Sequence, residues 1–240
     1  MRLRTHKQDQ TMAIKTYSFQ FGPYPQRLNI YLAEKQPANV EATIWPAPNA
    51  SAGIPPAEIK ALTPTGSLPI LQDDDGTVIG QSLAILEYLE ERASGPDMLG
   101  STPAQRARTR QFVHQFDEAL TFFALWARHG SHLSRGSVRS SQDVAEICAE
   151  RYFSQLRLID KSMGETAYIA GDFVSLADCV AMATLQYVSD FYSVPIPEDC
   201  ARLSSWFEAF SHRPSAASPP YPEDKRALGL GLMQQTGIKL

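Results

Sequence analysis

The sequence is poor in cysteine, has no excess of basic residues and contains no long apolar run. Its three cysteines, Cys148, Cys179 and Cys200, are far apart and have no metal-ligand spacing. This argues against a disulfide scaffold or a zinc motif and predicts free, buried thiols in a reducing compartment. A formal net charge of −4 gives no basic face for nucleic acid. No stretch approaches the length of a membrane span. These absences predict a cytoplasmic protein with no metal, nucleic acid or membrane as partner.

The first residues are basic but are not followed by an apolar segment. Residues 4–11 are all polar, whereas a secretory signal requires a hydrophobic stretch after its positive charges. We therefore expect residues 1–12 to form a loose extension rather than a signal. The chain of 240 residues is 43% hydrophobic, which is enough for one large domain or two small ones.

The first part of the chain alternates predicted strands with predicted helices. Apolar spacing and turn residues predict a strand at 14–21, a helix at 26–35, a strand at 40–45, a short helix at 57–62, a hairpin across 69–80 and a helix ending near 92. Pro69 opens the first hairpin strand, and an X-Pro bond in such a place is one where a cis peptide is expected. The order β-α-β-α-β-β-α predicts a compact α/β domain over residues 13–93.

The rest of the chain has no strand pattern and reads as helical. After a linker at 93–96, long helices are predicted at 103–129, 142–163, 175–191 and 200–212, which gives an all-helical domain over 103–213. Residues 214–240 are rich in Pro, Ser and Gly, and we expect an irregular tail that lies on the body or is partly disordered. Ser175 and Asp178 are spaced as a capping box before an apolar helix, which indicates a structural role.

Several short motifs occur in a specific order along these predicted elements. They are Leu68-Pro69, the run from Gln81 to Ile85 and the run from Ser175 to Asp178, preceded by a Pro23–Lys35 segment with Arg27 near its middle. In this order and spacing the chain resembles the cytosolic glutathione transferases over roughly residues 14–212. The resemblance implies a thioredoxin-like α/β N-terminal domain followed by a helical-bundle C-terminal domain, and a homodimer.

The resemblance also implies a set of glutathione-binding residues. The backbone of Leu68, exposed by a cis Pro69, would pair with the cysteinyl part of glutathione in the manner of a strand. Ser82, at the start of a helix, would hold the γ-glutamyl carboxylate with backbone N–H groups and the helix dipole. Gln81 would contact the other end of that group, and Lys60 is a candidate for the glycyl carboxylate.

The residue that activates the thiol departs from the family pattern. Aligned on Pro23 and Arg27, the usual serine or cysteine position is Gly22, which has no side chain. The nucleophile is the thiolate, and its formation must be favoured by a nearby donor. Three alternatives remain. In the first, a hydroxyl that donates to the thiolate comes from Tyr24, or from Ser18 or Tyr17 of the strand. In the second, backbone N–H groups of residues 22–26 are enough to stabilise the thiolate. In the third, the protein binds glutathione without catalysis. The missing cysteine argues against a thiol-disulfide reductase.

The second substrate is expected between the domains, against the helix that follows the linker. Aromatic residues there are candidates for the pocket wall, chiefly Phe116, Phe123 and Tyr187, and others that can contribute are Phe112, Phe122, Trp126, Phe191 and Tyr192. His114 is a candidate acid or base. The predicted function is attack of the glutathione thiolate on an apolar electrophile. The alternatives are glutathione-dependent ether or thioether cleavage, and binding of glutathione or a conjugate without catalysis.

Overall fold

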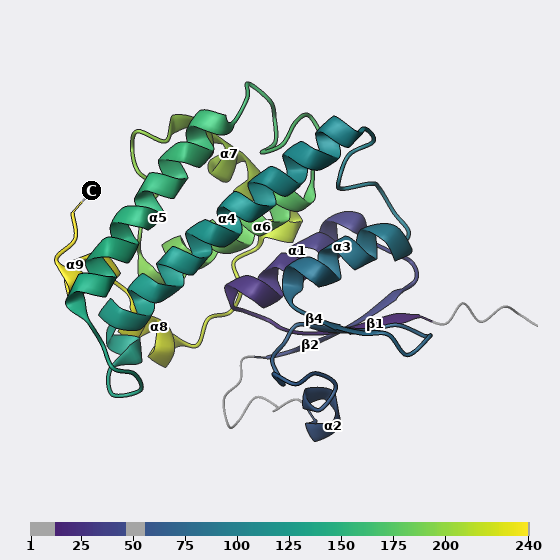
Figure 1. Ribbon diagram of the computed structural model, residues 1–240, viewed down its shortest axis with the longest axis horizontal. Helices are drawn as coiled ribbons and strands as arrows, with labels where there is room; N and C mark the ends of the chain where they lie inside the picture. The colour runs from purple at the N-terminus through teal and green to yellow at the C-terminus, as the bar shows by residue number, and fades with distance from the viewer. Residues whose placement is uncertain (1–12, 47–55, 240) are drawn as a thin grey trace, which may run out of the picture.

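The N-terminal part of the chain is a four-stranded mixed sheet with helices, as in thioredoxin (Figure 1). The computed structural model describes residues 13–46 and 56–239. The elements are β1 (Ile14–Phe19), α1 (Pro23–Lys35), β2 (Val40–Trp45), α2 (Ala57–Lys60), β3 (Ile70–Gln72), β4 (Val78–Gly80) and α3 (Ser82–Arg92). The strand order is β2-β1-β3-β4, with β1 and β2 parallel and the other pairs antiparallel. The predicted order of elements is confirmed.

The sheet separates a buried helical face from a second face that carries half-exposed residues. In β1, Ile14, Thr16 and Ser18 are buried, and α1 and α3 lie on one side of the sheet. Figure 1 shows α2 on the opposite side, away from the helical part of the molecule. Helix α1 begins three residues earlier than the apolar pattern predicted. Its first residue is Pro23, and proline is tolerated there because the N–H of the first helical residue has no partner within the helix.

The helical part is built on two long helices and a buried central one. Its elements are α4 (Pro103–Gly130), the 3₁₀ turn η1 (His132–Ser134), α5 (Gln142–Ser162), α6 (Leu176–Gln186), the π-helical turn η2 (Tyr187–Phe191), α7 (Ala201–Ser211), the 3₁₀ turn η3 (Pro214–Ala216), α8 (Glu223–Gly229) and α9 (Leu232–Thr236). Every residue of α6 is buried. The predicted capping box of Ser175 and Asp178 fixes the start of this central helix.

The C-terminal segment differs from the irregular tail that its composition predicted. It contains α8 and α9, and Leu232 of α9 is fully buried. The indole N–H of Trp126 donates to Oγ1 of Thr236, 3.2 Å away. The prediction was wrong because helices of seven and five residues are too short to show a helical period. The expectation that this segment lies on the body is confirmed for residues 214–239.

Ion pairs join the two parts of the molecule around α1 and α3. Arg213, after α7, donates to both carboxylate oxygens of Glu34 at 2.8 and 2.7 Å, and Ser215 donates to the same group. Arg110 of α4 makes a similar two-point contact with Glu87 of α3, at 3.0 and 2.8 Å. These contacts fix the helical part against the face of α1 and α3. No helix in the described ranges is both long and apolar enough to cross a bilayer.

Candidate functional site

The start of α1 is shaped by Gly22. This residue has φ of +102°, a region that side chains with a Cβ rarely adopt. A Cβ placed there would lie 3.6 Å from the side chain of Pro25, an ordinary contact, so backbone conformation rather than space favours glycine. The N–H of Gln26 donates to the Gly22 carbonyl at 3.0 Å. Because Pro23 and Pro25 have no N–H, the first turn of α1 keeps only the N–H of Tyr24 for a ligand.

The two predicted hydroxyl donors lie in different environments. Tyr24 is exposed, and its ring lines a cavity between the two parts of the molecule. Ser18 is only 2% exposed, and its hydroxyl lies 2.6 Å from Oδ1 of Asn29 in the core. Tyr17 is on the opposite face of β1, half-buried and stacked on Trp45. The structure therefore places Tyr24, and neither Ser18 nor Tyr17, at this cavity.

The predicted glutathione-binding residues meet at one end of the β3–β4 hairpin. Ile70 pairs with Gly80 in this hairpin, so Leu68 and Pro69, before β3, lie opposite Gln81 and Ser82, after β4. The Leu68–Pro69 peptide bond is cis, as the resemblance implied. Gln81 has φ of +71°, and non-glycine residues in that region often accompany functional sites. Ser82 is buried at the first position of α3.

Arg27 is a residue of this site that the sequence reasoning did not assign. Its side chain is 1% exposed, and Nη1 lies 2.8 Å from Oδ1 of Asp117 and 3.4 Å from Oγ of Ser82. Its Nε and Nη2 have no hydrogen-bond partner among the described residues. Burial lowers the pKa of Arg27, and Asp117 opposes this shift. The guanidinium lies beneath Ser82 with Nε and Nη2 shielded from solvent, and it adds positive charge to this end of the hairpin. The signal in the sequence was an arginine on the inward face of a helix.

Lys60 stands apart from these residues. It is exposed at the end of α2, the short helix on the other side of the sheet from α1 and α3. Its role toward the glycyl carboxylate stays a prediction.

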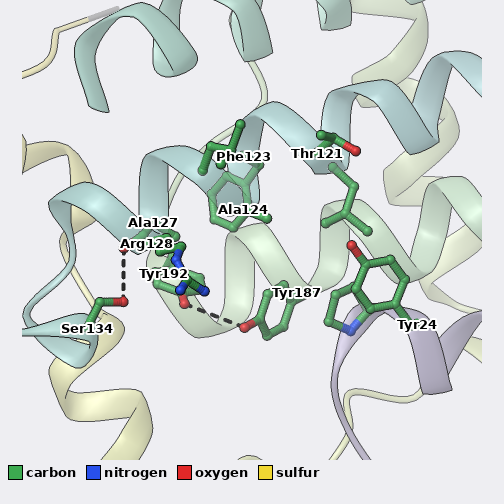
Figure 2. Close-up of a pocket in the computed structure, with 12 residues that line it drawn as sticks. Tyr24, Thr121, Phe123, Ala124, Ala127, Arg128, Ser134, Tyr187 and Tyr192 are labelled. Atoms are coloured by element: carbon green, nitrogen blue, oxygen red, sulfur yellow. Dashed lines mark hydrogen bonds between the residues drawn. The ribbon is translucent and has the colours of Figure 1, made fainter. Parts of the chain in front are cut away.

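A cavity of about 490 Å³ separates the start of α1 from the helical part (Figure 2). Its wall comes from α1, from one face of α4, from η1 and from the segment around η2. The lining residues are Pro23, Tyr24, Leu120, Thr121, Phe123, Ala124, Leu125, Ala127, Arg128, Ser134, Tyr187 and Tyr192. A cavity of this size and composition is suited to a small, mostly apolar ligand.

The aromatic residues predicted for the second substrate divide between cavity and core. Phe123 and Tyr187 line the cavity. Phe116 is fully buried and does not line it, because it lies two turns earlier than Phe123 on the same side of α4, beyond the reach of the cavity. His114 is exposed and lines a separate cavity of about 150 Å³ between α3 and α4. The period of α4 identified a buried face but could not tell which of its residues border a void.

Two tyrosines at the end of α6 give the cavity polar groups. The hydroxyls of Tyr187 and Tyr192 lie 3.5 Å apart (Figure 2). Burial raises the pKa of both phenols, so both remain neutral near pH 7. Residues 187–191 form a π-helical turn rather than the regular helix that was predicted to run to 191. Such turns are frequent at functional sites, because they shift side chains out of the helical register.

The cysteines take no part in this site. All three are free and buried, and burial raises the pKa of each thiol, that of Cys200 to about 11. A thiol with a raised pKa is a poor nucleophile at neutral pH. Among the described residues, no group of three or more His, Cys, Asp or Glu side chains is placed to hold a metal ion.

Known proteins resemble this chain along most of its length. Glutathione S-transferase 2 of Saccharomyces cerevisiae is 28% identical over 87% of this chain and 89% of its own length. FtsZ-localized protein A of Caulobacter vibrioides is 28% identical over 82% and 86%. The stringent starvation protein A homolog of Coxiella burnetii is 30% identical over 78% and 80%.

Solved structures share the same architecture. A glutathione S-transferase domain-containing protein from Marinobacter aquaeolei aligns with a TM-score of 0.71 at 27% identity, over 85% of this chain and all of its own. Gtt2 from Saccharomyces cerevisiae aligns with a TM-score of 0.69 at 25% identity, over 84% and 98%. A glutathione S-transferase from Methylobacillus flagellatus with glutathione bound has a TM-score of 0.73 at 18% identity, over 87% and 100%, which shows a shared fold.

Two family models cover most of the described chain. The model for the N-terminal domain of glutathione S-transferases matches residues 21–92, and the model for their C-terminal domain matches residues 113–214. Pro69 and Ser82 fall within the first match, and most of α4 together with α5, α6 and α7 falls within the second. The chain therefore belongs to the glutathione S-transferase family.

Proposed function

We propose that this protein is a glutathione transferase that joins the glutathione thiolate to an apolar electrophile. The observation that carries the proposal is the cavity itself. It has the start of α1 on one side and the aromatic face of α4 and η2 on the other. A thiol held at the β3–α3 end of the N-terminal part would be directed toward it.

Glutathione is held, in this proposal, by residues at the end of the hairpin. The backbone of Leu68 pairs with the cysteinyl unit, and the cis Pro69 keeps that backbone accessible. Ser82 and the first N–H groups of α3 bind the γ-glutamyl carboxylate, with Gln81 on its other side. Arg27 adds positive charge beneath Ser82. Lys60 binds the glycyl carboxylate.

Tyr24 is our candidate for the residue that favours the thiolate. The Tyr24 hydroxyl borders the cavity at the start of α1, and it could take the place of the donor side chain that Gly22 lacks. A phenol that donates to the sulfur lowers the thiol pKa and keeps the thiolate in place. In substitution, a carbon–sulfur bond forms while the leaving group departs with its bonding pair. In addition to an activated double bond, a carbon–sulfur bond forms while the π pair moves to the neighbouring carbon, which takes a proton from solvent. The thiol proton passes to solvent.

The alternatives of bond cleavage and of binding alone stay open. Cleavage of an ether or thioether would use the same thiolate at the same cavity. Binding without catalysis is supported by two relatives whose names describe no transferase, FtsZ-localized protein A and the stringent starvation protein A homolog. It also agrees with the predicted alignment, in which Gly22 takes the place of the usual activating residue. We also propose a cytoplasmic homodimer with domains at 13–93 and 103–213.

Calorimetry with glutathione and turnover of chlorodinitrobenzene together test the proposal. We expect binding and measurable conjugation. Absence of binding would overturn the glutathione site, and binding with no turnover on a broad panel of electrophiles would establish the carrier alternative instead.

Two serine variants make this test specific. Ser82→Ala is expected to weaken glutathione binding about 10-fold, the value of one hydrogen bond to a charged group. Ser141→Ala removes a serine that caps α5, far from the hairpin, and is expected to leave glutathione affinity unchanged. Equal affinities for the two variants would remove Ser82 from the site.

A further inference from the structure

We infer that the electrophile bound in the cavity carries a carboxylate, and that Arg128 binds it at the end of the cavity away from Tyr24. This rests on the proposed function, since it names the class of its second substrate. The inference would make the preferred substrate an aromatic or apolar molecule with one negative charge, rather than a neutral one.

The charge of the cavity wall is the first argument. Among its twelve lining residues, Arg128 is the one that carries a full charge at neutral pH, and there is no aspartate or glutamate. Tyr187 and Tyr192 remain neutral because burial raises the pKa of their phenols. A wall with one cation and no anion creates a positive potential at that end of the cavity, and because Arg128 is itself exposed, solvent screens part of that potential.

The position of Arg128 is the second argument. Leu120, Thr121, Ala124 and Arg128 follow one another at helical spacing, so they belong to one face of α4, and that face lines the cavity. No described residue forms an ion pair or hydrogen bond with the Arg128 side chain. Its guanidinium therefore has its donors available to a ligand, and this group matches the two oxygens of a carboxylate.

Neighbouring hydroxyls complete an anion-binding end. Tyr192, Tyr187 and Ser134 line the same part of the cavity as Arg128 (Figure 2). Hydroxyl groups can donate to a carboxylate oxygen, and they need no change of charge to do so. The Ser134 hydroxyl donates to the Ala127 carbonyl at 3.4 Å, and the two tyrosines share one hydrogen bond, so the tyrosine pair keeps one O–H for a ligand beside Arg128. Leu120, Phe123 and Ala124 give hydrocarbon surface along the length of the cavity.

The separation of the two ends suggests the shape of the substrate. Figure 2 shows Tyr24 and Thr121 toward one side of the cavity and Arg128 and Ser134 toward the other. Thr121 and Arg128 are seven positions apart on α4, which corresponds to about 10 Å along the helix axis. A benzene ring with a reactive carbon at one end and a carboxylate at the other, together with the reach of the arginine side chain, covers that length.

A different explanation for Arg128 is that it stabilises α4. It lies in the last turn of that helix, where a positive charge is favoured by the helix dipole. Arg128 is exposed, which fits that role too, but the role would be filled equally well by a lysine and requires no absence of acidic groups from the cavity. Comparing Arg128→Gln with a control arginine separates the two explanations.

The experiment compares two electrophiles that differ in one charge. The value of kcat/KM is measured at fixed glutathione for 4-chloro-3,5-dinitrobenzoate and for its methyl ester, and each value is divided by the uncatalysed rate with glutathione. The wild-type protein is expected to prefer the acid over the ester at least 10-fold. Arg128→Gln is expected to bring the ratio close to one, and Arg128→Lys to give an intermediate ratio, since lysine keeps the charge but not the two-point geometry.

Arg135→Gln is the matched control. Arg135 is an exposed arginine just after η1, carries the same charge and does not line the cavity. Its substitution is expected to leave the acid-to-ester ratio unchanged. An unchanged ratio in Arg128→Gln, or an equal change in both variants, would overturn the inference.

A binding measurement keeps this test independent of turnover. Calorimetry with 1-naphthoate and 1-naphthamide is expected to show tighter binding of the naphthoate, and loss of that difference in Arg128→Gln. If neither electrophile reacts, the proposed function fails, and the naphthoate comparison still decides the anion preference. If both electrophiles react equally and both naphthalenes bind equally, the inference fails and the transferase proposal stands.

Discussion

Tyr24 owes its accessibility to the way the chain enters α1. The glycine before the helix turns the backbone at positive φ, a proline takes the first helical position, and the exposed Tyr24 follows it. Ser18 lies only six residues earlier, but the pleat of β1 directs it into the core toward Asn29. Local geometry alone therefore separates two hydroxyls that are close in sequence.

Substitution of Tyr24 tests its role in activating the thiol. Tyr24→Phe is expected to lower kcat/KM for chlorodinitrobenzene about 10- to 100-fold, the value of one hydrogen bond to an anion. Glutathione affinity is expected to stay the same, and the thiolate absorbance near 240 nm in the complex should titrate at higher pH. Ser18→Ala is the control and should keep the rate while lowering stability by about 1 kcal/mol. A thiolate titration that is identical in wild type and Tyr24→Phe would contradict the role.

Substitution of Arg27 tests whether its guanidinium donors beneath Ser82 contribute to glutathione binding. Arg27→Lys keeps the charge that faces Asp117 but removes the free donors of the guanidinium. We expect glutathione affinity to fall about 10-fold in calorimetry, since a charged hydrogen bond is lost. Asp117→Asn keeps an acceptor for Arg27 and is the control. If Arg27→Lys lowers only the melting temperature and not the affinity, Arg27 is a structural residue.

The start of α6 shows an element whose structure was predictable and whose stability can be tested. Asp178 accepts hydrogen bonds from the backbone N–H and hydroxyl of Ser175, from the N–H of Ile169 and from the indole of Trp206. Asp178→Ala leaves these buried donors without a partner and is expected to cost about 3 kcal/mol or more in denaturant unfolding. Asp199→Ala, at an exposed ion pair with Arg157, is the control and should change little.

The packing of α9 on the end of α4 is a second element that can be tested. A Cβ at Gly130 would collide with the methyl group of Thr236, whose hydroxyl is fixed by Leu232 and Trp126. Gly130→Ala is therefore expected to loosen residues 223–239 and to speed their removal by a protease. Adding Thr236→Ser removes the methyl group, keeps the hydroxyl and is expected to restore resistance. Equal digestion of the single and double variants would contradict this packing.

The sequence predicted the order of elements better than the details of the site. Helix α4 has a regular apolar period over many residues, and the capping box of α6 is a short motif of neighbouring residues. Both signals are local, so both elements could be placed from the sequence. The turn at Tyr187 and the short helix α9 depend on contacts with distant segments, and the local spacing of apolar residues does not reveal such contacts. For the same reason Phe123 and Phe116, seven positions apart on one helix, could not be assigned to cavity and core in advance.

At the scale of the whole molecule, the cavity exists only because the two parts are held together. One wall is α1 and the others are α4 and the segment around η2. The segment after α7 returns to the N-terminal part, where Tyr221 packs against Phe21 at 5.8 Å and against Phe191 at 5.3 Å between ring centres. Glu34 and Arg213 anchor the beginning of this segment to α1. A change in that ion pair should therefore affect stability and cavity alike.

The pH dependence of the Glu34–Arg213 contact gives the last prediction. Hydrogen bonds from Arg213 lower the pKa of Glu34 below its ordinary value of 4.5. Its stabilising effect is therefore fully present above pH 4.5, and it is lost as pH falls further, through the lowered pKa of the folded state. Because Arg213 is about a third exposed, we expect a coupling of only about 1 kcal/mol at pH 7.

A double-mutant cycle with Glu34→Gln and Arg213→Gln measures this coupling by urea unfolding at pH 7 and near pH 3. The coupling is expected to be smaller at the lower pH, because protonation of Glu34 removes the carboxylate charge as pH falls through its lowered pKa. The exposed pair of Glu165 and Arg202 is the matched control and should show almost no coupling at pH 7, since both side chains are largely in solvent. A coupling for Glu34 and Arg213 that is equally large at both pH values would mean that packing, rather than charge, joins the C-terminal segment to α1. In that case, loss of the charge would leave the cavity between the two parts intact.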